Sequence, residues 1–362
     1  MLILSIETSC DETAMALLNI SQSKSKIQYR VLSESVASQI KLHRRYGGVV
    51  PNLASREHAK NFPIILKQTL KTSYPPISFK NLDLIAATIG PGLLPSLLIG
   101  VNGAKTLSWF LNKPLAGVNH LTGHLFSFLL NEEFQTSEGY SFDLSKQKDV
   151  FPAIGLIVSG GHTTLVKLSG FSKIKMLGET RDDAAGECLD KCARLLNLGY
   201  PGGPIIAKLA KNNPKITKVK FPRPMANSDN YDFSFSGLKT AVLYFVQSLT
   251  EQEKKELLPQ MCYEIQEAVV DVLIIKALKA AREYSARSLV LGGGVTANNR
   301  LREKIMLAAQ REHLKLFLPP IKYATDNATI MALPAYLRYH KVSQKTLINN
   351  WKKLDAKANI TI

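Results

Sequence analysis

Two histidines four residues apart, His120 and His124, have a type and spacing that indicate metal chemistry. If their segment is helical, positions i and i+4 share one face, so both imidazoles can bind one ion. A zinc peptidase of the HExxH type also needs a glutamate directly after the first histidine, and this chain has Leu121 there. The pair therefore predicts a metal site without peptidase chemistry; the alternative is two unrelated histidines. Asp326, an acid in an otherwise uncharged stretch, is the candidate third ligand.

Two glycine-rich turns are typical of anion binding. One is Ser159–His162, which contains Gly160 and Gly161, and the other is Gly292–Gly294. Without Cβ atoms, backbone N–H groups approach an anion closely, and a following helix adds a favourable dipole. Each turn alone is a weak signal, but together they suggest a bound nucleotide.

A third polar turn, near the N-terminus, has the opposite charge. Asp11 and Glu12 would repel a phosphate, so we expect them to serve a metal, a water molecule or a proton transfer. Asp11 is our candidate for proton transfer.

The elements that carry these turns follow one plan in each half of the chain. Two apolar runs flank a polar turn, which predicts a β-hairpin, and a later strand enters a glycine-rich turn and a helix. The hairpins are expected at 2–19 and 153–168, the later strands at 84–89 and 288–291, and one helix at 298–311. Strands alternating with helices predict an α/β fold with partly parallel sheets, duplicated, with a ligand cleft between the halves.

Composition places the chain among globular proteins. It has 362 residues, 45% of them hydrophobic, and a net charge of +17 that favours a polyanionic partner such as nucleic acid. Four scattered cysteines indicate reduced thiols in a cytoplasmic protein. The uncharged stretch Leu84–Ala104 is broken by glycine and proline, so we expect a buried strand and helix there and no membrane span. We expect no targeting segment before Leu2.

Cations concentrate in two segments that are candidates to bind the phosphates of a nucleic acid. The segment Ile205–Arg223 and the tail after His340 supply them, at Lys208, Lys211, Lys215, Lys218, Lys220, Arg223, Lys341, Lys345, Lys352, Lys353 and Lys357.

Seven motifs, in order along nearly the whole chain, resemble one family. They are Ile6–Thr13, Gly47–Pro51, Ala54–Arg56 with His58, His120-x3-His124, Val158–Thr163, Phe233–Thr240 and Gly293–Val295. The family is the tRNA N6-adenosine threonylcarbamoyltransferases (the TsaD family), formerly regarded as sialoglycoprotein endopeptidases. His162, where archaeal and eukaryotic cytosolic members usually have asparagine, resembles the bacterial or organellar type, and we expect the bacterial one because no transit peptide is expected.

The resemblance implies a duplicated actin/Hsp70/sugar-kinase-like (ASKHA) fold of two RNase H-like lobes with a central cleft. We expect an N-terminal lobe at 1–132, on which residues 325–362 pack back, and a second lobe at 133–324. The implied activity is transfer of threonylcarbamoyl from threonylcarbamoyl-AMP to the exocyclic amine of the adenosine 3′ of the anticodon, in tRNAs that read codons starting with A, with release of AMP.

The resemblance also implies site residues. The metal ligands would be His120, His124 and Asp326, holding one divalent ion, Fe2+ by resemblance, although Zn2+ suits the same ligands. The intermediate would be bound by Ile157, Val158, Ser159, Gly160, Gly161, Asp190, Gly203 and Asn298. Two positions depart from the family pattern, Asn52 for a common glutamate and Pro95 for a usual glycine, and neither is an implied ligand.

The implied partners are tRNA, a separate threonylcarbamoyl-AMP synthase, a shorter paralogue of the TsaB type and a small ATPase of the TsaE type. Three other functions compete with this one. A metalloprotease lacks its base, and a non-catalytic scaffold would be expected to lose the metal histidines. A small-molecule carbamoyltransferase or kinase of the same fold is the main alternative.

Overall fold

The N-terminal hairpin forms as the sequence predicts. The computed structural model describes residues 1–211 and 219–362. Strand β1 (Leu2–Glu7) pairs antiparallel with β2 (Glu12–Ser23), and all six residues of β1 are buried. A strand covered on both faces needs a nearly continuous apolar run, which Leu2–Ile6 supplies. The polar turn between the strands places Asp11 directly before β2.

β1 is an interior strand of a seven-stranded sheet ordered β5-β4-β1-β2-β3-β7-β6. The other strands are β3 (Lys26–Ser38), β4 (Leu84–Gly90), β5 (Leu115–Asn119), β6 (Gln135–Thr136) and β7 (Gly139–Asp143). β1, β4 and β5 run parallel, so their carboxyl ends meet at one edge of the sheet. His120 follows the last residue of β5, and the Glu7 end of β1 reaches the same edge.

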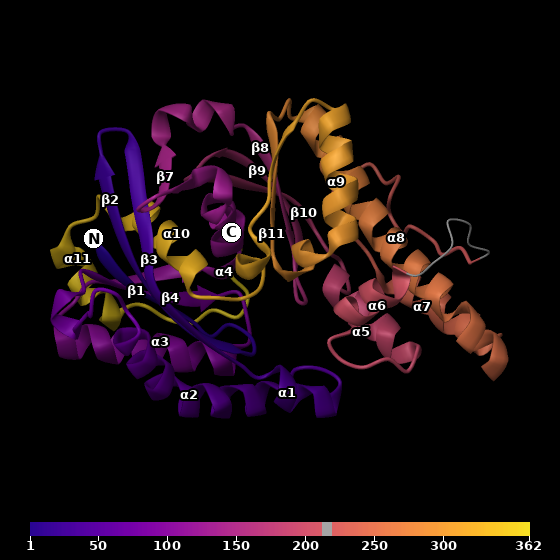
Figure 1. Cartoon of the computed structure of the whole chain (residues 1–362), viewed down its shortest axis with the longest axis horizontal. Helices are drawn as coiled ribbons and strands as arrows, with labels where there is room; N and C mark the ends of the chain where they lie inside the picture. The colour runs from indigo at the N-terminus through magenta and orange to yellow at the C-terminus, as the bar shows by residue number, and fades with distance from the viewer. Residues whose placement is uncertain (212–218) are drawn as a thin grey trace. The chain divides into compact units, whose positions relative to one another are not determined.

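Helices cover this first sheet (Figure 1). Helices α2 (Pro51–Lys71) and α3 (Leu94–Leu111) pack against each other, α2 on β2 and β3, and α3 on β4. Helix α10 (Thr329–Tyr339) packs on β1, β2 and β5 and also contacts α4 (His120–Phe126). The remaining short helices of this unit are α1 (Ile40–His43) and α11 (Gln344–Ile348).

The two departures from the family pattern fall at helix starts. Pro95 lies in the first turn of α3, where its missing N–H would have no helical partner, so a proline is tolerated there. Asn52 is exposed in the first turn of α2.

The second sheet repeats the order of the first. It is ordered β10-β9-β8-β11-β12, where β8–β9–β10 form antiparallel pairs and β8, β11 and β12 run parallel. Read from the parallel edge, this order matches β5-β4-β1-β2-β3. The bounds are β8 (Ala153–Val158), β9 (Thr163–Gly170), β10 (Lys173–Glu179), β11 (Ser288–Gly292) and β12 (Lys315–Phe317). The predicted duplication is therefore confirmed, and with it the actin/Hsp70/sugar-kinase-like fold class.

Among the described residues of unit 2, five α-helices surround the core of this second sheet. They are α5 (Ala185–Leu195), α6 (Gly202–Ala210), α7 (Ser236–Gln247), α8 (Glu251–Glu283) and α9 (Asn299–Arg311). The 33-residue α8 begins at a capping box in which Thr250 and Glu253 satisfy each other's backbone N–H groups. Its buried face packs on α6, α9 and β8.

The chain divides into two units, and their boundaries differ from the lobe boundaries that we expected. Unit 1 comprises 1–148 and 319–362, and unit 2 comprises 149–318. We expected the second lobe to begin at 133, but β7 pairs with β3, so residues 133–148 extend the first sheet. Likewise, 319–324 belong to unit 1 rather than to the second lobe.

Within the described residues, no helix has the length and apolar character needed to cross a membrane. The uncharged stretch that starts at Leu84 forms β4 and the first half of α3, as the sequence predicts.

Candidate metal centre and glycine-rich turns

The two histidines lie on a short helix that begins where β5 ends. His120 and His124 share one face of α4, as their spacing predicts, and their ring centroids are 4.6 Å apart. Asn119 caps this helix, because its Oδ1 accepts hydrogen bonds from the N–H groups of Leu121 (2.9 Å) and Thr122 (3.3 Å). Both imidazoles are buried.

Asp326 completes the predicted ligand set. Its Oδ1 lies 3.0 Å from Nε2 of His124 and 3.6 Å from Nε2 of His120, although 202 residues separate Asp326 from His124. One ligand atom from each of the three residues lies within 4.8 Å of the others. Two imidazole nitrogens and a carboxylate oxygen suit iron or zinc. The residues therefore fit a single divalent metal.

Glu7 supports this group, and we did not predict it. Its buried Oε2 lies 3.1 Å from Nδ1 of His120 and accepts a 2.6 Å hydrogen bond from Thr88, while Oε1 accepts one from the N–H of Ser9. A hydrogen bond from Nδ1 to a carboxylate leaves Nε2 of the imidazole available to a metal. Nδ1 of His124 has no such partner among the described residues. The signal in the sequence was a lone glutamate ending an apolar strand.

The charges of this cluster shift each other. Burial works to lower the pKa of His120, but the charges of Asp326 and Glu7 outweigh it and raise the pKa to about 9. Burial would raise the pKa of Glu7, yet the neighbouring His120 holds it below its ordinary value. Without a metal, His120 is therefore protonated at neutral pH, and binding of a cation must displace that proton.

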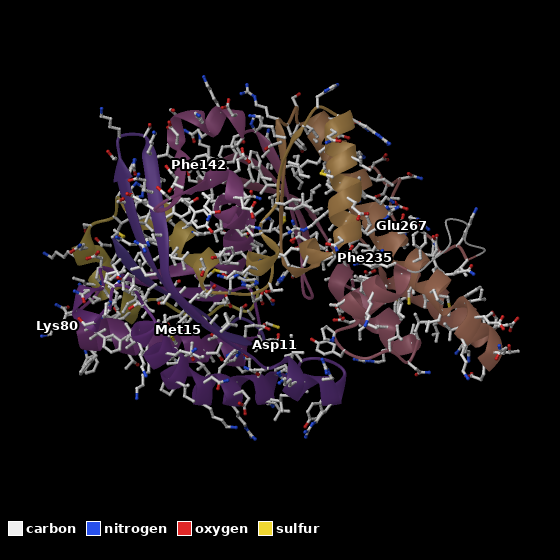
Figure 2. The ribbon with its side chains drawn as sticks, viewed as in Figure 1. Asp11, Met15, Lys80, Phe142, Phe235 and Glu267 are labelled. Carbon is white, nitrogen blue, oxygen red and sulfur yellow. The ribbon has the colours of Figure 1, made fainter. Side chains whose placement is uncertain are left out.

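Asp11 lies on the same unit, in the hairpin turn after β1 (Figure 2). It is buried, and its backbone carbonyl accepts a hydrogen bond from the N–H of Gln39. Burial, then Asp11, then Asp326 raise the pKa values of Cys10 and Glu12 well above their ordinary values. Cys10 is therefore a neutral thiol, and the turn is close enough to Asp326 for their charges to interact.

A buried histidine fixes this turn. His58, on α2, has its Nδ1 2.8 Å from Oγ1 of Thr13 and its Nε2 3.0 Å from the carbonyl oxygen of Cys10. The only neutral arrangement that satisfies both contacts has Nε2 donating to Cys10 and Nδ1 accepting from Thr13. His58 therefore bridges the two ends of the segment that carries Asp11.

In unit 2, the predicted substrate-binding residues surround the end of β8. Ile157 and Val158 are the last residues of that strand, and their side chains are buried, so only their backbones can contact a ligand. In the following turn, Ser159 and His162 bond each other through Ser159 N–H to His162 O and His162 N–H to Ser159 Oγ. A Cβ added at Gly160 or Gly161 would meet nothing within 4 Å, so these backbones face open space.

Two further segments adjoin this turn. The N–H of Gly186, in the first turn of α5, donates to the carbonyl oxygen of Ser159. Gly293 has φ +92°, and a Cβ there would lie 2.4 Å from the carbonyl oxygen of Val158, so only glycine fits. The close approach holds the turn after β11 against β8. The short 3-10 helix Gly294–Ala297 then leads to Asn298.

Asp190, Gly203 and Asn298 are positioned by hydrogen bonds. Oδ1 of Asp190 accepts from the N–H groups of Gly202 (2.6 Å) and Gly203 (3.4 Å). Burial raises the pKa of Asp190 in spite of these two bonds. Asn298 caps α9, with Oδ1 accepting from the N–H of Leu301, and its Nδ2 donates to Oε1 of Gln266 at 2.9 Å. Asp190 and Asn298 were predicted site residues, whereas Gln266 was not.

One predicted phosphate contact, Arg223, is corrected by the structure. Arg223 pairs with Glu264 and Asp271, so its guanidinium is already occupied. Lys208, Lys211 and Lys220 are exposed, whereas Lys215 and Lys218 lie outside the described residues.

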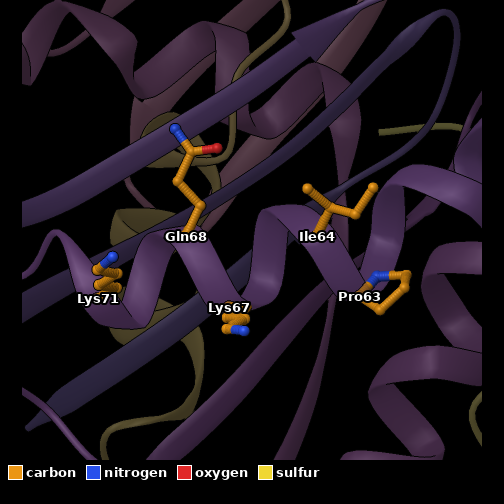
Figure 3. A pocket seen from close by; sticks show the side chains of 5 residues that line it. All are labelled: Pro63, Ile64, Lys67, Gln68 and Lys71. Atoms are coloured by element: carbon orange, nitrogen blue, oxygen red, sulfur yellow. The ribbon is translucent and has the colours of Figure 1, made fainter.

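An open hollow of about 510 Å3 follows α2 and carries none of the predicted site residues (Figure 3). It is lined by one helix alone, through Pro63, Ile64, Lys67, Gln68 and Lys71. None of the three proposed metal ligands lines it.

Known proteins resemble this chain over most of its length. Residues 30–333 match the family model for tRNA N6-adenosine threonylcarbamoyltransferase. A curated protein of that name from Thermosipho africanus is 43% identical over 341 residues, covering 94% of this chain and 95% of its own. One from Bacillus cereus is 42% identical over 351 residues, covering 96% and 94%.

The fold has a more distant likeness as well. A crystal structure of HypF from T. kodakarensis matches 96% of this chain and 48% of its own with a TM-score of 0.58 and 14% identity, which shows a shared fold only. The family model, in contrast, matches a range that contains both histidines of α4, and the two curated relatives cover 94% and 96% of this chain. The chain therefore belongs to the tRNA N6-adenosine threonylcarbamoyltransferases, a family of acyltransferases that modify tRNA.

Proposed function

We propose that this chain transfers the threonylcarbamoyl group from threonylcarbamoyl-AMP to N6 of the adenosine 3′ of the anticodon, in tRNAs that read codons starting with A. The observation that carries the proposal is the convergence of His120, His124 and Asp326, from segments 202 residues apart, in a chain of this family. The net charge of +17 supports a tRNA substrate.

The reaction needs alignment more than a strong protein nucleophile. The adenine N6 attacks the carbamoyl carbon, the bond from that carbon to the phosphate oxygen breaks, and AMP leaves with the bonding electrons. Because an exocyclic adenine amine is a weak nucleophile, removal of its proton during attack would help, and the Asp11 carboxylate is our candidate acceptor. The chain therefore contributes chiefly by holding the two reactants together.

The glycine-rich turn of unit 2 supports binding of the anhydride. The exposed backbones of Gly160 and Gly161 can donate N–H groups to its phosphate or to the developing oxyanion. Ile157, Val158, Ser159, Asp190, Gly203 and Asn298 would hold the rest of the intermediate. Asp190 and Asn298 both have polar atoms fixed by neighbouring hydrogen bonds, so these side chains would lose little conformational freedom on binding.

His120, His124 and Asp326 would hold one divalent metal, Fe2+ by family resemblance, with Zn2+ also suited to the ligands. When bound, the metal supplies positive charge for an anionic phosphate. Glu7 keeps the His120 imidazole oriented, and Leu121 stands buried where a peptidase would have its glutamate base. This last feature disfavours peptidase activity.

We further propose that the chain works in the cytoplasm with other proteins. Threonylcarbamoyl-AMP would come from a separate synthase, because we find no motif for activating threonine and bicarbonate. A shorter paralogue and a small ATPase would complete the modification, as the family resemblance implies. No observation favours the alternative of a small-molecule carbamoyltransferase or kinase.

Nucleoside mass spectrometry tests the proposal. The purified chain, its two partner proteins, unmodified tRNA and pre-made threonylcarbamoyl-AMP should yield threonylcarbamoyladenosine at the position 3′ of the anticodon. Asp326→Asn is the matched control, because it keeps the shape of the side chain and removes its charge. Absence of product with the wild-type chain, in the presence of both partners, would contradict the assignment. Modification from ATP, threonine and bicarbonate by the chain alone would contradict the need for a synthase.

A further inference from the structure

Residues 355–362, which we call the C-terminal strap, run along the turn that follows β4. The N–H of Lys357 donates to the carbonyl oxygen of Ile89 at 2.7 Å, and the N–H of Gly92 donates to the carbonyl oxygen of Ala358 at 3.1 Å. A Cβ at Gly90, whose φ is +142°, would lie 1.9 Å from the carbonyl oxygen of Lys357. The strap and this turn are therefore in direct backbone contact.

The strap also contacts the residue that caps the histidine helix. Nδ2 of Asn119 donates to the carbonyl oxygen of Thr361 at 3.2 Å. The other end of the same amide, Oδ1, accepts from the N–H groups of Leu121 and Thr122 in α4. One side chain thus joins the strap to the first turn of the helix that carries His120 and His124.

A second route leads from the strap to His120 through the turn after β4. The N–H of Leu93 donates to the carbonyl oxygen of Ser9 at 2.8 Å, and Oγ of Ser9 lies 3.2 Å from Nδ1 of His120. A Cβ at Gly92 would lie 2.5 Å from the same Ser9 oxygen. The strap, the turn and the imidazole therefore form one continuous chain of contacts.

The chain before the strap is tied to the same strand. Nδ2 of Asn350 donates to the carbonyl oxygen of Leu115 in β5 at 2.9 Å. A Cβ built on Gly117 would lie 2.6 Å from Cδ1 of Leu354, so the Leu354 side chain packs closely against this glycine. His120 directly follows β5. The contacts of Asn350 and Leu354 therefore hold this strand in place, and the strap holds Asn119, which caps α4.

We infer that the C-terminal strap is a positioning segment for the metal ligands: through Asn119 and the turn at Gly92, it sets the orientation of α4. A helix of seven residues has too few hydrogen bonds to be stable alone, so its orientation depends on its cap and its packing. The inference rests on the proposed metal site, because it predicts that the strap determines how tightly His120 and His124 bind a metal.

Three variants of the full protein separate the contacts. Asn119→Ser keeps an oxygen that can cap α4 but removes the amide Nδ2 that donates to Thr361. Lys357→Pro removes the N–H that bonds Ile89. Truncation after Leu354 removes the whole strap. Asn131→Ser is the control, since Asn131 caps another short helix of the same unit through the N–H of Glu133.

Two measurements decide the outcome. Hydrogen exchange of the Leu121 and Thr122 amides in the metal-free protein reports the order of α4, and competition with a chelator reports zinc affinity. We expect faster exchange in all three strap variants and a loss of zinc affinity of about tenfold, the low end for residues that support a metal ligand. Asn131→Ser should change neither.

Unchanged exchange and unchanged zinc affinity in the truncated protein would overturn the inference. Faster exchange with unchanged zinc affinity would also overturn it, because the strap would then order α4 without affecting the metal. If the truncated protein fails to fold, Asn119→Ser and Lys357→Pro decide by the same two readouts. Failure of the wild-type chain to bind zinc or Fe2+ at all would instead contradict the proposed metal site, and the exchange rates would still show whether the strap orders α4.

Discussion

Glu7 and His120 face each other at 3.1 Å in the interior of unit 1, although 113 residues separate them in the sequence. The carboxylate accepts from Nδ1 and so presents Nε2 of the imidazole toward Asp326. Thr88 and Ser9 hold the two oxygens of Glu7, which leaves the carboxylate little freedom. The orientation of one metal ligand is thus built into β1 itself.

Replacing Glu7 with glutamine should weaken metal binding. The amide keeps the size of the side chain but removes the charge that stabilises the donor N–H of His120, so we expect zinc affinity to fall about 10- to 100-fold. Chelator competition measures the change. Asp83→Asn is the control, since Asp83 accepts a hydrogen bond from the N–H of Leu2 at the other end of the same strand. Equal affinities for wild type and Glu7→Gln would show that the contact has no role in metal binding.

Removal of a proposed ligand should abolish transfer and leave the fold intact. His124→Ala and Asp326→Asn should each lose the metal, which is worth several kcal/mol of transition-state stabilisation, or about a hundredfold or more in rate. A chain of this length does not need a metal to fold, so both variants should unfold cooperatively with normal far-UV circular dichroism. Wild-type transfer by metal-free His124→Ala protein, from pre-made threonylcarbamoyl-AMP, would refute the metal's role.

Leu121→Glu tests the peptidase alternative by adding the glutamate that this chain lacks. The change creates the HExxH pattern on α4, but Leu121 is buried, and the sequence pattern alone supplies no peptide-binding site. We expect no proteolysis of casein or of a denatured protein substrate. Proteolysis that appears in this variant and disappears in Leu121→Glu combined with His124→Ala would revive the peptidase interpretation.

His58 should make the stability of the chain depend on pH. Burial lowers the pKa of His58 below its ordinary value of 6.5, so the unfolded chain binds more protons as the pH falls through that value. The contribution of His58 is therefore complete above pH 6.5 and is lost as the pH falls toward the lower pKa of the folded state. We expect His58→Gln to cost about 1–2 kcal/mol at pH 8, because it loses the buried contact with Thr13, and less at pH 5.

Urea unfolding of wild type and His58→Gln at pH 8, 7, 6 and 5 measures this difference. A cost that stays constant across the series would mean that His58 does not titrate differently in the folded and unfolded chain. His313→Gln is a suitable control, since His313 is not among the buried residues.

Exposed lysines of unit 2 should contribute to tRNA affinity. Lys208→Glu combined with Lys211→Glu should weaken tRNA binding and flatten its dependence on salt, by about 0.9 in the logarithmic slope for each phosphate that the protein no longer neutralises. Lys173→Glu combined with Lys175→Glu makes the same change in net charge on exposed residues of β10. Equal tRNA affinities for the two double variants would show that the 205–223 segment is no specific footprint, and the transferase assignment would stand.

The sequence predicts most of this site because the relevant signals are local. The hairpins follow from runs of apolar residues around a polar turn, and the spacing of His120 and His124 needs only a helix. Asp326 was suggested by its isolation in an uncharged stretch and by family resemblance. The partner of His120 was not predicted, because the pairing of Glu7 with an imidazole 113 residues away depends on β1 and β5 reaching one sheet edge.

Two other expectations failed for a similar reason. The unit boundary was placed too early because the stretch after Leu130 is polar, which indicates a linker, whereas its residues add β6 and β7 to the first sheet. Arg223 was counted among the phosphate contacts because a charge in a sequence shows no partner. In the folded chain, α8 brings Glu264 and Asp271 to it. In both cases the outcome depends on contacts between segments that are distant in the sequence.

The repeated sheet order gives the two hairpin turns equivalent places with opposite chemistry. Each turn has four residues, Thr8–Asp11 after β1 and Ser159–His162 after β8. The first turn ends in Asp11, and the second contains Gly160 and Gly161, whose backbones are open to a ligand. Strands buried on both faces tolerate few changes, whereas a four-residue turn can change its charge without disturbing them. The same sheet order can therefore carry two turns of different charge, while the packing of each sheet is set by its strands.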